Sequence, residues 1–133
     1  MKVTIDEIIP CECKECQEVT VFFSIAGNSY YAFGTKDDFI SGEVAEVDFD
    51  YLEGNISWEE RFSKNSKKEK SLTRTGNWSY NGLGIIISIN PVIADFGDIK
   101  LDLGYFTHDP LVIGEYIYER IDRLNIFPKR NLR

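Results

Sequence analysis

The chain of 133 residues has one histidine, no apolar run long enough to span a bilayer and no glycine-rich phosphate loop. A transmembrane helix needs about 20 mostly apolar residues, and Asp6 and Glu7 interrupt the apolar stretch that a secretory signal needs. Catalysis by a pair of histidines is excluded, and residues 81–84 (NGLG) match no nucleotide-binding fingerprint. We therefore expect a cytoplasmic protein with reduced cysteines and no cofactor.

The composition is that of a folded domain rich in β structure. Hydrophobic residues make up 43% of the chain and charged residues 28%, which is ordinary for a globular protein. The length predicts one domain over residues 1–133. Nine phenylalanines and seven tyrosines favour strands over helices.

Charge is distributed very unevenly along the chain, whose net charge is −7. Residues 37–60 hold nine acids and no base, and residues 61–74 hold six bases and one acid. The first segment alone therefore carries more negative charge than the whole chain shows. The nine acids are Asp37, Asp38, Glu43, Glu46, Asp48, Asp50, Glu53, Glu59 and Glu60, and the six bases are Arg61, Lys64, Lys67, Lys68, Lys70 and Arg74.

Two patterns in the first half of the chain predict strands. Residues 19–25 (VTVFFSI) and 30–33 (YYAF) flank residues 26–29, where Gly27-Asn28 suits a tight turn, so we expect a hairpin. In residues 43–54 (EVAEVDFDYLEG), apolar side chains alternate with acids. Strict alternation predicts a strand with one buried and one solvent-exposed face, and it places Glu46, Asp48 and Asp50 on the exposed face.

The second half predicts further hairpins joined by loops. Residues 61–76 lack an apolar period and indicate a mobile basic loop, and Asn81-Gly82 predicts a hairpin turn within residues 78–89. Pro91 ends or interrupts that strand, and residues 92–94 and 99–103 are expected to form another hairpin around residues 95–98. Residues 113–127 fit a strand or a helix. We favour a strand, because β-branched and aromatic residues are frequent there, and we expect a frayed tail over residues 128–133.

This succession of hairpins predicts an all-β, mainly antiparallel fold with little helix, either a small barrel or a sandwich. The run IISINPVIADFGDIKLDLG, followed by a loop and GEYIYERIDRLNIF, resembles the last strands of an OB-type barrel. In such a barrel a strand with glycine-aspartate turns precedes a long closing strand. The resemblance covers about 40 residues and implies a fold but no activity.

Cys11, Cys13 and Cys16 form the most motif-like feature, C-x-C-x-x-C. Three thiolates could bind zinc, with His108 or a carboxylate as the fourth ligand. Structural zinc sites usually combine two separated pairs of ligands, and a second pair is missing. A redox C-x-x-C pair would need a βαβ context that the sequence does not predict. We therefore favour a cysteine-rich turn and expect no metal.

No arrangement of residues points to an enzyme. His108 lies in FTHDP, where Asp109 and Pro110 indicate a turn. Glu46, Asp48 and Asp50 would lie about 6.6–7 Å apart along a strand, which matches the separation of paired glycosidase carboxylates. A chain of this length leaves little room for a substrate cleft. We expect a protein that is not an enzyme.

The acidic segment instead predicts a binding surface for a basic protein. An aligned acidic face attracts and orients a cationic partner. We expect this surface to consist of Asp37, Asp38, Glu46, Asp48, Asp50 and Glu53, with Tyr51 and Trp58 as apolar anchors at its rim. Immunity proteins of bacterial toxin systems are similar to this chain in size, charge and lack of motifs. The interpretation we favour is an immunity or inhibitor protein that covers the active site of a basic, nuclease-type toxin.

An alternative is an OB-like module that binds single-stranded nucleic acid. Such sites combine a basic groove with aromatic stacking platforms. The residues would be Lys64, Lys67, Lys68, Lys70, Arg74, Trp78 and Tyr80. The net charge of −7 opposes this alternative, because it repels a polyanion.

Overall fold

The protein is an all-β, mainly antiparallel structure, as the sequence predicted. The computed structural model describes residues 1–12 and 15–129, with 55% strand and 7% helix, and its nine strands form one sheet. The elements are β1 (Lys2–Pro10), β2 (Glu18–Ile25), β3 (Asn28–Thr35), β4 (Val44–Glu53), α1 (Trp58–Ser63), β5 (Ser71–Arg74), β6 (Tyr80–Ser88), β7 (Val92–Asp95), β8 (Lys100–Gly104), the short 3-10 helix η1 (Pro110–Val112) and β9 (Tyr116–Pro128).

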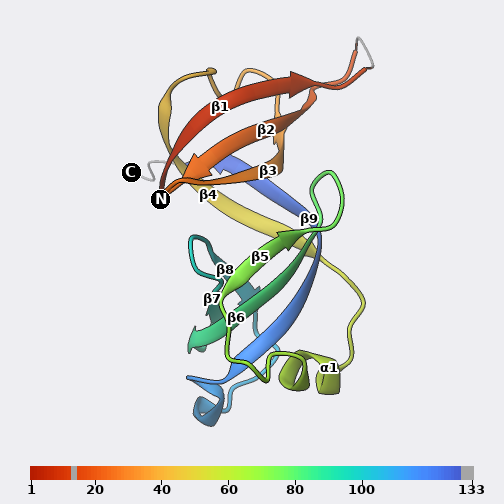
Figure 1. Ribbon diagram of the computed structural model, residues 1–133, viewed down its shortest axis with the longest axis vertical. Helices are drawn as coiled ribbons and strands as arrows, with labels where there is room; N and C mark the ends of the chain where they lie inside the picture. The colour runs from red at the N-terminus through yellow and green to blue at the C-terminus, as the bar shows by residue number, and fades with distance from the viewer. Residues whose placement is uncertain (13–14, 130–133) are drawn as a thin grey trace.

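Five strands close into a barrel-like ring, which forms the upper half of Figure 1. The order around the ring is β1-β2-β3-β9-β4, and it closes where Phe33 of β3 pairs with Asn125 of β9 in parallel. This is a Greek-key order that an OB barrel also has. The resemblance noted in the sequence correctly predicted β9 as the long closing strand. It was wrong to place β6, β7 and β8 in the same barrel, because they lie outside the ring.

The long strand β9 belongs to both halves of the molecule. Its first part pairs with β6, from Tyr116 opposite Ile85 to Ile121 opposite Tyr80. Its second part pairs with β4. Figure 1 shows β9 running from the lower half, which holds β5–β8 and α1, into the ring. The segment over residues 113–127 that fitted a helix or a strand is therefore a strand from Tyr116 onward.

Apolar side chains on the inner faces of these strands form one core. The alternation predicted for β4 is present, and β2 alternates as well. In β9 the alternation is interrupted at residues 124–126, which are all buried. Exclusion of these side chains from water is the main stabilising contribution to such a fold. The fully buried apolar residues include Ile5, Val21, Phe23, Ile86, Ile99, Leu101, Ile117, Leu124 and Ile126.

Polar contacts also join the two halves. Asp98, in the turn between β7 and β8, accepts hydrogen bonds from the Asn28 side chain at 2.7 Å and the Tyr30 hydroxyl at 2.6 Å. The Tyr80 hydroxyl donates to the carbonyl of Tyr31 at 2.7 Å. Burial and the neighbouring Asp98 carboxylate raise the pKa of Tyr30, so the hydroxyl remains a donor. These contacts hold β3 against β6 and the β7–β8 turn.

The hairpin predicted at Asn81-Gly82 is wrong, because both residues lie inside β6. A Cβ atom on Gly82 would lie 2.8 Å from the Phe96 ring, and one on Gly84 would lie 2.7 Å from the carbonyl oxygen of Asp95. These glycines allow close packing against the neighbouring strand and do not form a turn. The hairpin over residues 92–103 is confirmed as β7 and β8.

The basic segment over residues 61–76 is not an irregular loop throughout. It begins within α1, and residues 71–74 form β5, which pairs with β6. The Ser57 side chain and the Glu60 backbone and side chain form a capping box at the start of α1, a signal for helix initiation. The frayed tail predicted over residues 128–133 is wrong for its first two residues, and residues 130–133 lie outside the described residues. Strand β9 includes Pro128, and the Lys129 N–H donates to the carbonyl of Glu46 at 3.0 Å.

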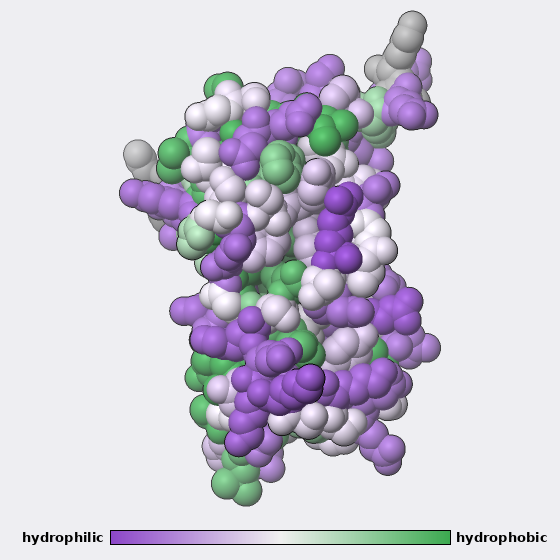
Figure 2. All heavy atoms as spheres, in the orientation of Figure 1, coloured by the Kyte–Doolittle hydropathy of each residue, from purple (hydrophilic) through white to green (hydrophobic). Residues whose placement is uncertain are grey.

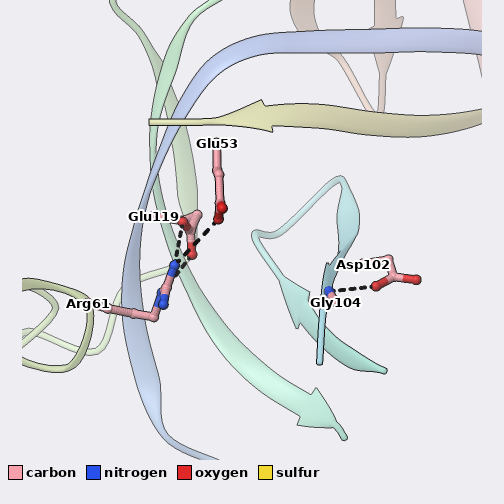
Figure 3. A network of polar contacts seen from close by, with 5 residues as sticks. All are labelled: Glu53, Arg61, Asp102, Gly104 and Glu119. Atoms are coloured by element: carbon pink, nitrogen blue, oxygen red, sulfur yellow. Dashed lines mark hydrogen bonds and ion pairs between the residues drawn. The ribbon is translucent and has the colours of Figure 1, made fainter. Parts of the chain in front are cut away.

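A buried ion pair attaches α1 to β9, as Figure 3 shows. Glu119 lies on the inner face of β9 and is fully buried. Both of its carboxylate oxygens accept hydrogen bonds from the Arg61 guanidinium, at 3.0 and 3.1 Å, and Glu53 lies 3.9 Å from the same guanidinium. Burial raises the pKa of Glu119, and Arg61 opposes that shift. The pair therefore fixes the position of the helix.

We predict that Arg61→Met destabilises the fold by about 3–5 kcal/mol at neutral pH, because it leaves a buried carboxylate unpaired. The substitution also raises the pKa of Glu119 further, so the folded state retains a proton that the unfolded state releases. The stability of the variant should therefore be highest below the ordinary pKa of glutamate, and it should fall as the pH rises through the folded-state pKa of Glu119. Urea denaturation over a range of pH measures both effects.

The control is Arg61→Met combined with Glu119→Met, which removes both charges and should recover most of the loss. Equal stability of the single and double variants at every pH would contradict the role assigned to the ion pair.

Candidate functional site

The acidic row of β4 lies on one exposed face, as the alternation predicted. Glu46, Asp48 and Asp50 are exposed, and Val47 between them is buried. The strand is hydrogen-bonded on both sides, to β1 near its start and to β9 along the rest. The three carboxylates are therefore held on a rigid surface.

Much of this row already has partners within the chain. The N-terminal ammonium lies 3.2 Å from a Glu46 carboxylate oxygen. Asp50 accepts a hydrogen bond of 2.7 Å from the side-chain amide of Asn125, and Glu53 is part of the Arg61 ion-pair network. Asp48 is the member for which no hydrogen bond or ion pair is found among the described residues. The row is therefore partly neutralised within the chain.

The other residues predicted for this surface lie in different places. Asp37 and Asp38 are exposed in the connection between β3 and β4. Tyr51 points toward the inner side of β4, and burial, followed by the nearby Glu119 carboxylate, raises its pKa. Trp58 lies in α1, beyond the end of β4. Trp58 therefore belongs to a different element from the acidic row, and Tyr51 is only half-exposed. Their role as rim anchors stays a prediction.

Two apolar residues that the sequence analysis missed lie beside the row. Leu52 is 50% exposed, and Phe127, which pairs with Asp48 across the strands, is 40% exposed. Leu52 shares the parity of the acids in β4, so the alternation contained this signal. The position of Phe127 depends on the register of β4 and β9 and could not be predicted. We define the β4–β9 face by Asp48, Asp50, Leu52, Arg123 and Phe127.

A groove of about 300 Å³ runs along the β4–β9 face toward β3. Arg123 lies over the Phe33 ring, 4.1 Å from its centroid, and its Nε donates to the Asn125 side chain at 2.8 Å. Asn125 in turn donates to Asp50, so one hydrogen-bond chain joins the arginine to the acid. The groove is lined by Phe33, Gly34, Thr35, Asp50, Tyr51, Leu52, Arg123, Asn125 and Phe127.

Aromatic rings continue along the outer side of β2 and β3. The Tyr31 ring is tilted against the Phe22 ring, with their centroids 4.8 Å apart, and the Arg74 guanidinium lies 3.8 Å from the centroid of the Tyr31 ring. Trp78 meets the Phe33 ring edge-on at 5.1 Å. Arg74 and Arg123 therefore cover neighbouring rings on alternate residues of β3. The ion pairs found among the described residues involve neither arginine.

The residues predicted for nucleic-acid binding do not form one basic groove. Lys64 pairs with Glu60 at 3.0 Å and Lys70 with Asp95 at 3.5 Å, while Lys67 and Lys68 are exposed. The Trp78 indole donates to the hydroxyl of Thr20 at 2.9 Å, which limits its movement. Tyr80 is a core residue. The prediction of Tyr80 as a stacking platform is wrong, because its ring packs between the two halves.

The proposed cysteine and histidine sites receive no support as metal centres. Cys13 lies outside the described residues, and within residues 1–12 and 15–129 no three potential ligands come together. A hydrogen bond with the Cys11 thiol is the largest factor that raises the pKa of Cys16 to about 11, which disfavours a thiolate. The His108 Nδ1 atom lies 2.9 Å from the side-chain oxygen of Asn90, so the contact joins the loop before η1 to the turn between β6 and β7.

Comparison of the chain with protein families, with curated proteins and with solved structures found no match. In the part of the chain that the structure describes, no helix has the length and apolar character needed to cross a membrane.

We predict that Asp50→Ala and Asp48→Ala differ in their effect on stability. The Asn125 amide is buried and would lose its acceptor in Asp50→Ala, which should cost about 1–3 kcal/mol. Asp48→Ala removes an exposed side chain and should change stability by no more than about 0.5 kcal/mol. Urea denaturation of both variants measures the difference, and equal midpoints would show that the Asn125–Asp50 bond contributes nothing.

Proposed function

We propose that this protein is a non-enzymatic binding protein that recognises a basic protein partner through the β4–β9 face. The partner is a nuclease-type toxin or effector, and the protein acts as its immunity or inhibitor protein in the cytoplasm by covering the active site. The observation that carries the proposal is the position of two exposed apolar side chains, Leu52 and Phe127, beside the exposed carboxylates Asp48 and Asp50.

The chemistry of this face suits a protein that binds nucleic acid. Such a partner presents cationic side chains where phosphates bind, and carboxylates can occupy those positions. Apolar side chains such as Phe127 supply affinity when they are buried at the centre of an interface, and the surrounding charges supply orientation and speed of association. The negative net charge of the chain attracts a basic partner at longer range.

Rigidity of the surface supports the same proposal. The Arg123–Asn125–Asp50 hydrogen-bond chain orients these side chains before a partner arrives, and strands β4 and β9 are each paired on both sides along part of their length. A preorganised surface loses less conformational entropy on binding. Inhibition by coverage needs only such a surface, without a catalytic group.

We predict that the basic protein encoded beside this chain binds it tightly, and that the affinity falls as the salt concentration rises. Asp48→Lys should weaken binding at least about tenfold, or 1.4 kcal/mol, because it places a cation opposite a cationic surface. Phe127→Ala should weaken binding by a similar factor through lost burial. Calorimetry with the purified partner, together with an assay of its nuclease activity, measures affinity and inhibition.

The control is Glu12→Lys, which makes the same change of charge in the connection between β1 and β2. It should leave affinity almost unchanged. Unaltered binding of the Asp48→Lys and Phe127→Ala variants would exclude the β4–β9 face, and the absence of any nuclease inhibition would exclude the inhibitor function.

A second candidate is binding of single-stranded nucleic acid on the adjacent side of the ring. The specific observation that favours it is that Arg74 lies over the Tyr31 ring and Arg123 lies over the Phe33 ring. Among the described residues, neither arginine forms an ion pair with a carboxylate. Arginine planes and aromatic rings both stack with bases. This candidate uses other residues than the lysines that the sequence indicated.

We predict that, if the second candidate is correct, a fluorescein-labelled oligothymidine binds at low salt and the affinity falls in Arg74→Ala and in Arg123→Ala. Loss of one stacking contact should cost about 1–3 kcal/mol, whereas Lys67→Ala should cost much less. Fluorescence anisotropy measures the affinity. No change of anisotropy on titration with the protein would remove this candidate and leave the inhibitor proposal intact.

A further inference from the structure

A hollow of about 270 Å³ lies between α1 and η1, and it shares no lining residue with the groove on the β4–β9 face. Trp58 and Phe62 of α1 form one wall, and η1 and the residues that flank it form the other. We call it the Trp58 hollow and define it by its lining residues, which are Trp58, Phe62, Asp109, Leu111, Val112 and Glu115.

The walls of the Trp58 hollow expose large apolar side chains to solvent. Trp58 is 53% exposed and Leu111 is 81% exposed. Figure 2 shows hydrophobic atoms at the lower end of the molecule, where Figure 1 places the coil of η1. Exposed apolar patches with a polar rim are typical of binding sites, and tryptophan is among the residues that contribute most to interfaces.

Contacts within the protein hold these walls in place. The Trp58 ring lies 4.8 Å from the Phe62 ring and meets Phe106 edge-on at 5.7 Å. The Asp109 carboxylate accepts a hydrogen bond from the Leu111 N–H at 2.9 Å, which caps η1. The buried ion pair of Arg61 with Glu119 fixes the helix that carries Trp58. The hollow is therefore preorganised.

The charge of the Trp58 hollow is negative. Two of its six lining residues, Asp109 and Glu115, are exposed acids, and none is a base. Arg61, in the helix that forms one wall, is bound to Glu119 and lies over the Phe106 ring at 4.5 Å, so it is not available to neutralise them. An apolar wall with an indole ring beside two carboxylates matches one kind of side chain, a long apolar stem with a cationic end.

We propose that the Trp58 hollow receives an arginine side chain of a protein partner. The planar guanidinium stacks on the Trp58 indole and donates to the carboxylates of Asp109 and Glu115, while its methylene groups cover Leu111. Arginine fits better than lysine, because its flat, weakly hydrated cation stacks on aromatic rings and its donors are arranged in a fork. This site is separate from the β4–β9 face and does not depend on the proposed function.

The test is a titration with the peptide acetyl-Gly-Arg-Gly-amide, followed by nuclear magnetic resonance of the two tryptophan indole N–H groups. The Trp58 signal should shift with saturation, and the Trp78 signal, which reports on the ring half, should not shift. Acetyl-Gly-citrulline-Gly-amide, which has almost the same shape without the charge, should cause little shift. Asp109→Asn, which retains an acceptor for the Leu111 N–H, and Glu115→Gln should each weaken binding by roughly two- to fivefold, as for a partly exposed ion pair.

Asp48→Lys on the β4–β9 face is the matched variant and should leave the titration unchanged, so this test and that of the inhibitor function can fail separately. An equal shift with the citrulline peptide, or equal shifts of both indoles, would overturn the proposal. Tighter binding of acetyl-Gly-Lys-Gly-amide than of the arginine peptide would overturn arginine as the occupant.

Discussion

The structure depends above all on the pairing of β9 with two different partners. A strand presents alternate side chains to opposite faces, but β9 changes which residues face the core where its pairing with β4 shifts register between Leu52 and Glu53. The buried residues are Ile117 and Ile121 before this irregularity and Leu124 and Ile126 after it, so the irregularity sets which residues face outward beside β4. A shift of one residue would turn Phe127 and Arg123 inward and bring Leu124 and Ile126 to the surface. The burial of those apolar residues, and with it the core of both halves, therefore determines the composition of the β4–β9 face.

Strand β9 also determines the position of α1, the only α-helix among the described residues. Glu119 stands on the inner side of β9 between Ile117 and Ile121, at a position where an apolar residue would otherwise be expected. A buried carboxylate is costly unless it is paired, and the Arg61 guanidinium provides both hydrogen bonds. Because Arg61 belongs to α1, this requirement brings Trp58 to the edge of the Trp58 hollow. A charge in the core thus positions an aromatic residue at the surface.

Sequence patterns predicted the elements better than the surfaces they create. The alternation over residues 45–51 depends on neighbouring residues only, so it correctly predicted a strand and the outward direction of Asp48. Leu52 has the same parity as the acids of this strand, so its outward direction could also have been predicted from the sequence. The Asn81-Gly82 pattern led to a wrong prediction of a turn. Position 82 needs glycine because the Phe96 ring packs against its backbone, and this contact joins residues that are distant in the sequence. The pairing of Asp48 with Phe127, of Arg61 with Glu119 and of Arg74 with Tyr31 also depends on register and packing, which local patterns do not contain.

The charges on the β4–β9 face and the arginines stacked beside it affect an approaching partner at different distances. Asp50 is engaged with Asn125 and, through it, with Arg123, so these opposite charges largely compensate each other beyond a Debye length of about 8 Å at physiological salt. Within about one Debye length a partner experiences the net charge of −7, which favours a cationic protein over nucleic acid, and salt screens this charge at larger distances. The stacked arginines act only at contact, where desolvation and stacking outweigh long-range repulsion. An anionic ligand would therefore have to approach against the field before these arginines could hold it, whereas a basic protein is attracted throughout its approach. This asymmetry is the physical reason to rank the inhibitor function above nucleic-acid binding.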